Sequence, residues 1–97
     1  MNIQQVDRKK LRDHLHAVEE KFPLRFIGLL PRGSAAHVSD DDAVDLLAEK
    51  LPGLSLIGLT GAELELSERL KRPVGIVLKS ELRGREEREV IAQAQPV

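Results

Sequence analysis

The sequence contains no cysteine, tryptophan or tyrosine, and its aromatic residues are limited to Phe22 and Phe26. Without cysteine the chain can form neither a disulfide nor a thiolate metal site. Two phenylalanines offer few side chains on which nucleic-acid bases could stack. The formal net charge of −1, from 15 basic and 16 acidic residues, supplies no long-range attraction to nucleic acid or anionic lipid. Partners of these two classes are therefore not expected.

Long apolar runs are also missing. No stretch approaches the roughly 20 residues that span a membrane, and the N-terminal sequence MNIQQVDRKK lacks the apolar core of a signal peptide. We therefore expect a cytoplasmic protein that does not bind a membrane. What is present is a chain of 97 residues, 41% hydrophobic and 32% charged. This composition argues against disorder and suits one small domain over 1–97.

The hydrophobic pattern predicts helices alternating with strands. A first helix is expected from Asp7 to Pro23, because apolar residues between Leu11 and Phe22 recur at spacings of four, three and four. Strands are expected at 24–30, 44–49 and 73–78. The third is almost entirely apolar, as in a central strand covered on both faces. The chain is thus predicted to be α/β (α+β), with a small mixed sheet and flanking helices.

Two further helices complete the prediction. One runs from Ser55 to about Arg72, and another covers 85–94, followed by a short tail at 96–97. The face of the first that should be buried carries Leu56, Leu59, Ala62, Leu66 and Leu70. The inward face of the second carries Val90, Ile91 and Ala94. The cations Arg69, Lys71 and Arg72 are expected to complement the helix dipole, and His14 and His16 are expected at the surface.

Glycines interrupt two of the expected strands. Gly28 could mark a β-bulge or a close approach of backbone, or it could be an ordinary structural glycine. Gly75 is unusual in a buried strand, because glycine has no side chain to pack there.

The segment 25–49 holds the candidate functional residues. An apolar run ends at Gly33 and Ser34, a short helix or turn at 34–37 follows, and an acidic cluster precedes the next strand. The turn could be a phosphate-binding helix start or a loop glycine with a capping serine. The aspartates could be Mg²⁺ ligands or a solvated turn. If the two strands are neighbours, turn and carboxylates meet at one end of the sheet.

Several segments follow one another in a recognisable order. They are GSAA at 33–36, VDLL at 44–47, PGLSL at 52–56, ELELSE at 63–68, RPV at 72–74 and AQPV at 94–97. In this order they resemble the minimal nucleotidyltransferases of the DNA polymerase beta superfamily, over nearly the whole chain from about Leu24 onward. The resemblance implies a nucleotidyltransferase-like fold and ATP with Mg²⁺ as cofactors of any retained activity. It also implies a HEPN-type toxin protein as partner, because these proteins often act as antitoxins.

The resemblance also implies a nucleotide site. Gly33 and Ser34 would contact phosphate through backbone and hydroxyl groups. His37 stands where the family has an arginine in its turn, and a histidine there could touch a phosphate or remain solvated.

The acidic part of the implied site is incomplete. Asp45 matches the second of the family's acids, whereas Ala43 and Gly75 occupy the other two acid positions. At most one weakly held Mg²⁺ is then expected. Asp42 or Asp41 could supply a ligand from the loop, although a loop ligand is less preorganised. Metal and catalytic roles, if any activity is retained, therefore fall to Asp42 and Asp45.

Three functions remain open from the sequence. The first is an antitoxin-like module that binds a partner with absent or weak catalysis, since a fold can outlive its site. The second is an active Mg²⁺-dependent nucleotidyltransferase that moves AMP from ATP to a protein hydroxyl, using Asp42 and Asp45. The third is an unrelated small α/β domain with coincidental similarity, which a sheet keeping Ser34 far from Asp45 would favour.

Overall fold

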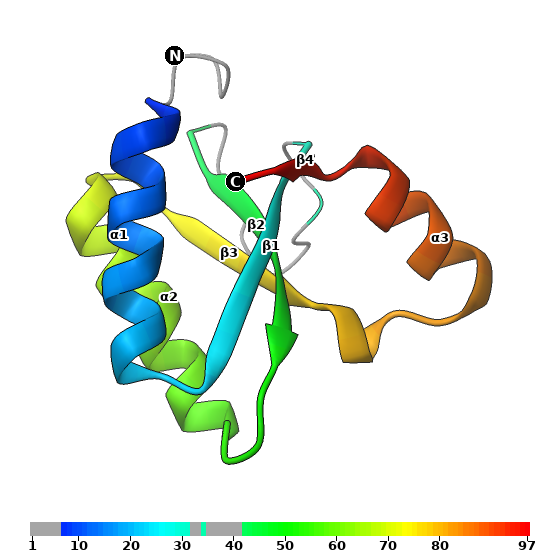
Figure 1. The fold of residues 1–97 in the computed structure, drawn as a ribbon, viewed down its shortest axis with the longest axis horizontal. Coiled ribbons are helices and arrows are strands. Elements are labelled where there is room, and N and C mark those ends of the chain that lie inside the picture. Colours follow the sequence, from blue (N-terminus) through cyan, green and yellow to red (C-terminus); the bar gives the residue numbers. More distant parts are fainter. Residues whose placement is uncertain (1–6, 32–33, 35–41) are drawn as a thin grey trace.

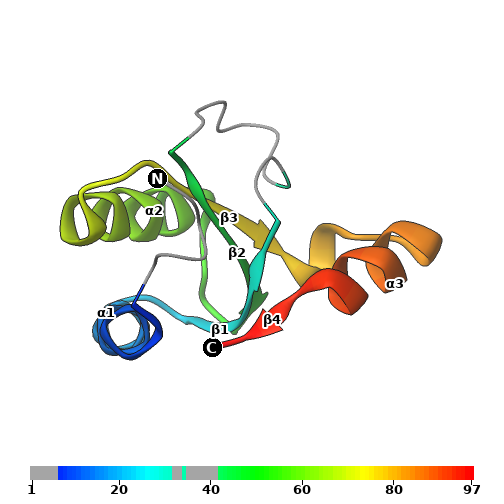
Figure 2. The same ribbon diagram turned by 90° about the horizontal axis from the view of Figure 1, so that it is seen from above.

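The computed structural model describes residues 7–31, 34 and 42–97. Its elements are helix α1 (Arg8–Lys21), strand β1 (Leu24–Leu30), strand β2 (Val44–Lys50), helix α2 (Leu56–Leu70), strand β3 (Val74–Leu78), the 3₁₀ turn η2 (Lys79–Glu81), helix α3 (Gly84–Gln93) and strand β4 (Gln95–Pro96). Figure 1 shows α1 and α2 side by side on one face of the sheet, with α3 on the other side. The view from above in Figure 2 shows the same layers. The predicted mixed sheet with flanking helices is confirmed, and the expected short helix or turn at 34–37 lies outside the described residues except for Ser34.

Helix α1 begins where its capping residue predicts. The Asp7 carboxylate accepts hydrogen bonds from the backbone N–H groups of Lys9, at 3.0 Å, and Lys10, at 3.1 Å. These are two of the donors that the start of a helix leaves without an intrahelical partner. The residues that the helix buries against the sheet are Leu11, Leu15 and Val18. The apolar spacing seen in the sequence is therefore the face that attaches α1 to the core.

The sheet has the strand order β3-β2-β1-β4. Strand β1 is antiparallel to both β2 and β4, and β2 is parallel to β3. The prediction of a central third strand is wrong, because β3 lies at an edge of the described sheet. The apolar sequence of β3 indicates that both faces of the strand are covered. It does not indicate how many strands lie beside it. The expected C-terminal tail is also corrected, since Gln95–Pro96 pairs with β1 as β4.

Helix α2 closes the outer edge of β3. The backbone N–H of Val74 donates to Ser67 Oγ at 3.1 Å, and that of Ile76 donates to Glu63 Oε2 at 2.7 Å. Both N–H groups belong to an edge strand, whose open donors would otherwise be available for pairing with another chain. Two polar side chains of α2 thus accept the hydrogen bonds that a further strand beside β3 would accept.

The core lies on both faces of the sheet. The larger cluster fills the space between the sheet and the helices α1 and α2, and includes Val44, Leu46 and Ala48 from β2. The smaller cluster lies on the opposite face and consists of Leu30, Leu47 and Leu82, with Ile27, Val77, Val90 and Ala94 packed against it. No residue of α3 is buried, so this second face is covered less completely than the first.

Two apolar side chains lie differently from the prediction. Leu56 was expected on the buried face of α2 but is 79% exposed. At about 100° per residue it stands roughly 120° around the helix from Ala62, which is buried. Ile91 was expected to point inward from α3 and is exposed, because the inner face is taken by Val90 and Ala94. Among the helices of the described ranges, none has the length and apolar character to cross a bilayer.

Candidate functional site

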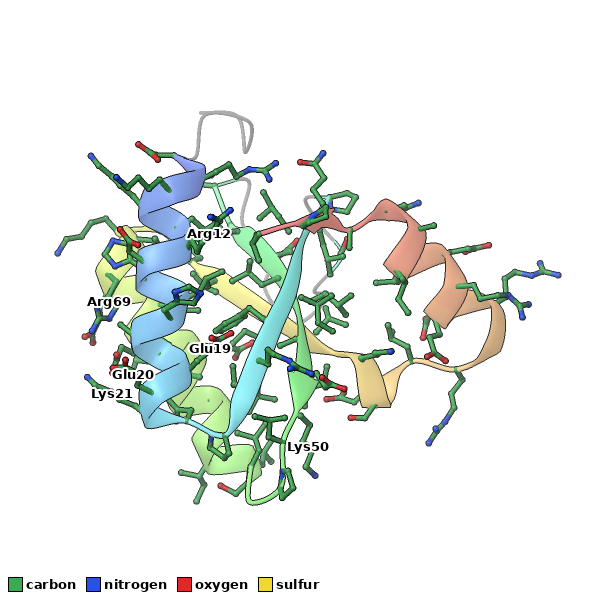
Figure 3. All side chains as sticks on the ribbon, in the orientation of Figure 1. Arg12, Glu19, Glu20, Lys21, Lys50 and Arg69 are labelled. Carbon is green, nitrogen blue, oxygen red and sulfur yellow. The ribbon has the colours of Figure 1, made fainter. Side chains whose placement is uncertain are left out.

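A β-bulge in β1 shapes the approach to the candidate site. The pairing of β1 with β2 shifts by one residue between Phe26 and Gly28. The backbone N–H of Phe26 donates to Glu19 Oε2 at 2.7 Å, and Figure 3 shows Glu19 extending from α1 toward β1. A Cβ on Gly28 would lie only 2.9 Å from the Cβ of Ala94. Of the alternatives for this glycine, the bulge and the close approach are therefore both present.

The bulge changes which face the end of β1 presents. Leu29 packs in the cluster under the helices, whereas Leu30 packs in the cluster on the opposite face. Because a bulge inserts one residue, it reverses the alternation of side chains that follows it. The shifted register places Leu30 opposite Asp45 on β2. The neighbouring-strand arrangement expected for this segment is therefore confirmed.

Asp45 is fully buried, and among the described residues it is the one polar or charged side chain in that condition. Its register partners are Leu30 on β1 and Gly75 on β3. Leu47, two positions later, packs on the face away from α1 and α2, and strand alternation puts Asp45 on that same face. A buried carboxylate needs hydrogen bonds or a cation to offset its lost hydration. Burial of a carboxylate makes Asp45 the candidate site residue of this face.

Arg72, which lies 30 positions later in the sequence, holds Asp42 in place. The Arg72 Nε donates to the backbone oxygen of Asp42 at 2.9 Å, and Nη2 lies 3.4 Å from Asp42 Oδ1. The side chain of Arg72 is only 11% exposed. The prediction that Arg72 serves the helix dipole is wrong, because α2 ends at Leu70 and the guanidinium turns to the loop end instead. No local sequence pattern signals this role, because the contact joins residues 30 positions apart.

The turn residues are described only in part. Ser34 is exposed, its Oγ donates to the backbone oxygen of Pro31 at 2.7 Å, and its N–H donates to the same oxygen at 3.2 Å. Gly33, His37 and Asp41 lie outside the described residues. Within 7–31, 34 and 42–97, no group of three or more His, Cys, Asp or Glu is placed to hold a metal ion.

The opposite end of the same face carries exposed charges. Arg25 Nη2 lies 2.6 Å from Glu49 Oε1, across a register pair of β1 and β2. This hydrogen bond, with the attraction between the two charges, lowers the pKa of Glu49 below its ordinary value. The face therefore has an exposed ion pair at one end and a buried carboxylate at the other.

Comparison with solved structures identifies one similar chain, described as "Structure of putative minimal nucleotidyltransferase". The TM-score is 0.62 and the sequence identity 25%, with 96% of this chain and 98% of the other covered. No protein-family model and no curated protein matches the sequence. The similarity spans almost all of both chains, so the nucleotidyltransferase-like fold expected from the sequence motifs is supported by the arrangement of the whole molecule.

Proposed function

We propose that this nucleotidyltransferase-fold protein is an antitoxin-like module that binds a partner protein, with absent or weak catalysis. The observation that carries the proposal is the neighbourhood of Asp45. Its register partners are Leu30 and Gly75, and the residue two positions earlier is Ala43. None of these three residues supplies a carboxylate. The two further acids that the resemblance implies beside Asp45 are therefore missing.

This donor set fits one weakly held Mg²⁺ and does not fit a pair. Bound in pairs, such ions neutralise charge on the attacking and leaving oxygens of a phosphoryl group. Asp42 is a described residue that could replace a missing ligand, but its carboxylate lies toward Arg72. A cation would have to compete with that guanidinium. If activity is retained, ATP and Mg²⁺ are its cofactors, with Gly33, Ser34 and His37 contacting the nucleotide.

An apolar surface on α2 supports the partner-binding part of the proposal. Leu56, Ile57 and Leu64 are 79%, 85% and 60% exposed. Large apolar side chains gathered on one helix are typical of a surface that another protein covers. We expect this surface to receive a helical partner, and the resemblance favours a HEPN-type toxin. A cytoplasmic location stays a prediction.

The second candidate is the active enzyme that transfers AMP to a protein hydroxyl. It is favoured by the fixed backbone of Asp42, since Arg72 holds this residue at the start of the strand that carries Asp45. A preorganised backbone reduces the cost of bringing a loop carboxylate to a metal.

Calorimetric titration with ATP, with and without Mg²⁺, separates the two candidates. The first predicts at most weak Mg²⁺-dependent binding of ATP. Tight Mg²⁺-dependent ATP binding that is lost in Asp45→Asn would overturn it in favour of the enzyme.

Partner binding is tested by co-purification with a HEPN-domain protein. Replacing Leu56 and Ile57 by aspartate should abolish the complex, because charged side chains would have to be buried in an apolar contact. The matched control is Ile91→Asp, which makes the same kind of change at an exposed apolar side chain of α3 and should leave the complex intact. Equal loss in both variants would contradict the α2 surface as the docking site.

A further inference from the structure

A cavity of about 250 Å³ lies on the side of the sheet that faces away from Asp45. Helices α1 and α2 run antiparallel, so the N-terminal end of α1 lies beside the C-terminal end of α2 (Figure 1). The cavity opens between these two ends. Val44, at the start of β2, also lines the cavity and belongs to the core cluster under α1 and α2.

The polar lining of the cavity contains more basic than acidic side chains. It consists of Lys10 and His14 from α1, of Arg69 and Arg72 at and beyond the end of α2, and of the capping residue Asp7. Figure 3 labels Arg69 at the C-terminal end of α2, beside α1. His14 was expected at the surface, but it is half-buried in this lining. Lys10, His14 and Arg69 from the two helices, with Arg72 beyond α2, thus line one small space.

The carboxylates around the cavity are already engaged. Asp7 caps α1 by accepting from the backbone of Lys9 and Lys10. Glu65 accepts from both Lys21 and Arg69. Asp42 contacts Arg72 as described above, and these contacts use Nε and Nη2 of a guanidinium that has a further amino group.

The charge of α1 points the same way. The first turn of α1 contains no acidic residue. The positive end of the helix dipole lies there and disfavours cations. Basic residues nevertheless occupy this turn, from Arg8 to Lys10. The Asp7 cap offsets part of this repulsion. A bound anion would offset more of it, because Lys10 and the partial positive charge of the helix start both attract negative charge.

We infer that this cavity binds a small phosphate-bearing molecule. Lysine supplies a point charge, and arginine supplies a planar fork of donors that matches phosphate oxygens. Leu11 and Leu70 form apolar walls beside these groups, which suit a small organic substituent on the phosphate. The volume is just below the range of about 300–1,000 Å³ typical of ligand pockets, which favours a phosphomonoester over a triphosphate.

The cavity lies on the face of the sheet opposite Asp45, so it is a separate site from any nucleotide site there. Alternation along β2 places Val44 and Asp45 on opposite faces of the sheet. Arg72 connects the two sides, because it lines the cavity and also bonds Asp42. A ligand that contacts Arg72 should therefore be sensed at the backbone of Asp42.

The test is an NMR titration of the full chain with inorganic phosphate and with phenyl phosphate, at constant ionic strength. Saturable amide shifts are expected at Leu11, His14 and Leu70, with a smaller shift at Asp42. Phenyl phosphate should bind more tightly than inorganic phosphate because of the apolar walls. Shifts that do not saturate, or that spread over the whole surface, would overturn the inference.

Matched variants locate the binding. The double variant Lys10→Gln with Arg69→Gln should weaken binding by about tenfold or more, as expected when charge-assisted hydrogen bonds are lost. The control Arg85→Gln with Arg88→Gln removes the same charge from α3 and should leave binding unchanged. If the double variant fails to fold, the exposed Lys10→Gln alone carries the test. Equal weakening by the α3 control would show general charge attraction and contradict a built site.

Discussion

Gly28 has no side chain, and this allows the segment that leads into β4 to lie close to β1. A Cβ would lie 2.9 Å from Ala94 Cβ and 3.0 Å from the backbone oxygen of Gln95. We expect Gly28→Ala to destabilise the protein by about 1–3 kcal/mol, because β4 must move away from β1. Urea denaturation measures the change. Gly58→Ala, in the first turn of α2, is the control, and a loss of the same size there would contradict this reason.

A second residue-scale prediction concerns acid. Lys21 lies 3.2 Å from Glu65 and Arg69 lies 3.1 Å from it. The hydrogen bond from Lys21 does most to lower the pKa of Glu65 below its ordinary value of 4.5, and the one from Arg69 adds to it. A carboxyl whose pKa is lower in the folded state stabilises the fold above the unfolded pKa and loses this effect as pH falls through the folded value.

The measurement is Tm against pH for Glu65→Gln. The variant should have a lower Tm than the wild type at neutral pH, and the gap should shrink as pH falls below about 4.5. Glu68→Gln, on the exposed side of the same helix, should not follow this course. A gap that is constant from pH 7 to pH 3 would contradict the ion pairs as its cause.

At the scale of elements, α2 supplies the hydrogen-bond acceptors for the outer edge of β3 that a further strand would supply. Glu63 and Ser67 accept from the outward N–H groups of Ile76 and Val74. Glu63→Ala should cost about 1–3 kcal/mol, because the Ile76 N–H would be left in a buried position without its acceptor.

Glutamine at position 63 keeps a side-chain oxygen, so Glu63→Gln should recover part of the loss. The exposed change Glu68→Ala should stay within about 0.5 kcal/mol. Chemical denaturation of the three variants gives the comparison. The closing of the edge would be disproved as the cause if glutamine were as harmful as alanine.

The elements that the sequence predicts well are those set by local contacts. Helix α1 follows from a cap and an apolar spacing within one segment, and β1 and β2 follow from short segments rich in apolar residues. The edge position of β3 depends on which strands lack neighbours, and no local pattern encodes that. Strand β4 covers only Gln95–Pro96, too short for any periodicity to show.

The candidate site shows the same limit. The resemblance of VDLL to a family motif placed Asp45 on a strand, and the structure adds that it is buried between Leu30 and Gly75. The contact of Arg72 with Asp42 joins residues 30 positions apart, and it was missed because it depends on the turn taken after α2. Sequence motifs named the candidate residues, whereas the contact that holds Asp42 depends on the fold.

At the scale of the whole molecule, the sheet separates two regions of different chemistry. The helix side has the larger core and the cationic cavity, and the opposite side has the buried Asp45 and the thinner cover of α3. The ends of the described chain are tied across this arrangement, because Arg8 donates to the backbone oxygen of Pro96 at 3.3 Å and also contacts Gln95 Oε1. The first helix and the last strand therefore hold one another against β1.

The proposal that catalysis was lost with two carboxylates predicts that the whole molecule can regain metal binding. In the double variant Ala43→Asp with Gly75→Asp, three carboxylates would converge near the end of the sheet, where Asp45 is buried. Like charges in a buried place repel one another, so this variant should be less stable than the wild type in metal-free buffer. Mg²⁺ binds only the folded arrangement and should raise its Tm, by an amount that corresponds to about 2.7 kcal/mol at 100 times Kd.

Differential scanning calorimetry with EDTA and with Mg²⁺ measures this response. The wild type should show almost no dependence of Tm on Mg²⁺, and adding Asp45→Asn to the double variant should abolish the gain. If the double variant does not fold, Gly75→Asp alone should give a smaller gain in the same direction. A wild-type Tm that rises with Mg²⁺ as steeply as that of the double variant would show that this chain still holds the ion without the two missing acids, because the ion can stabilise only a fold that already binds it.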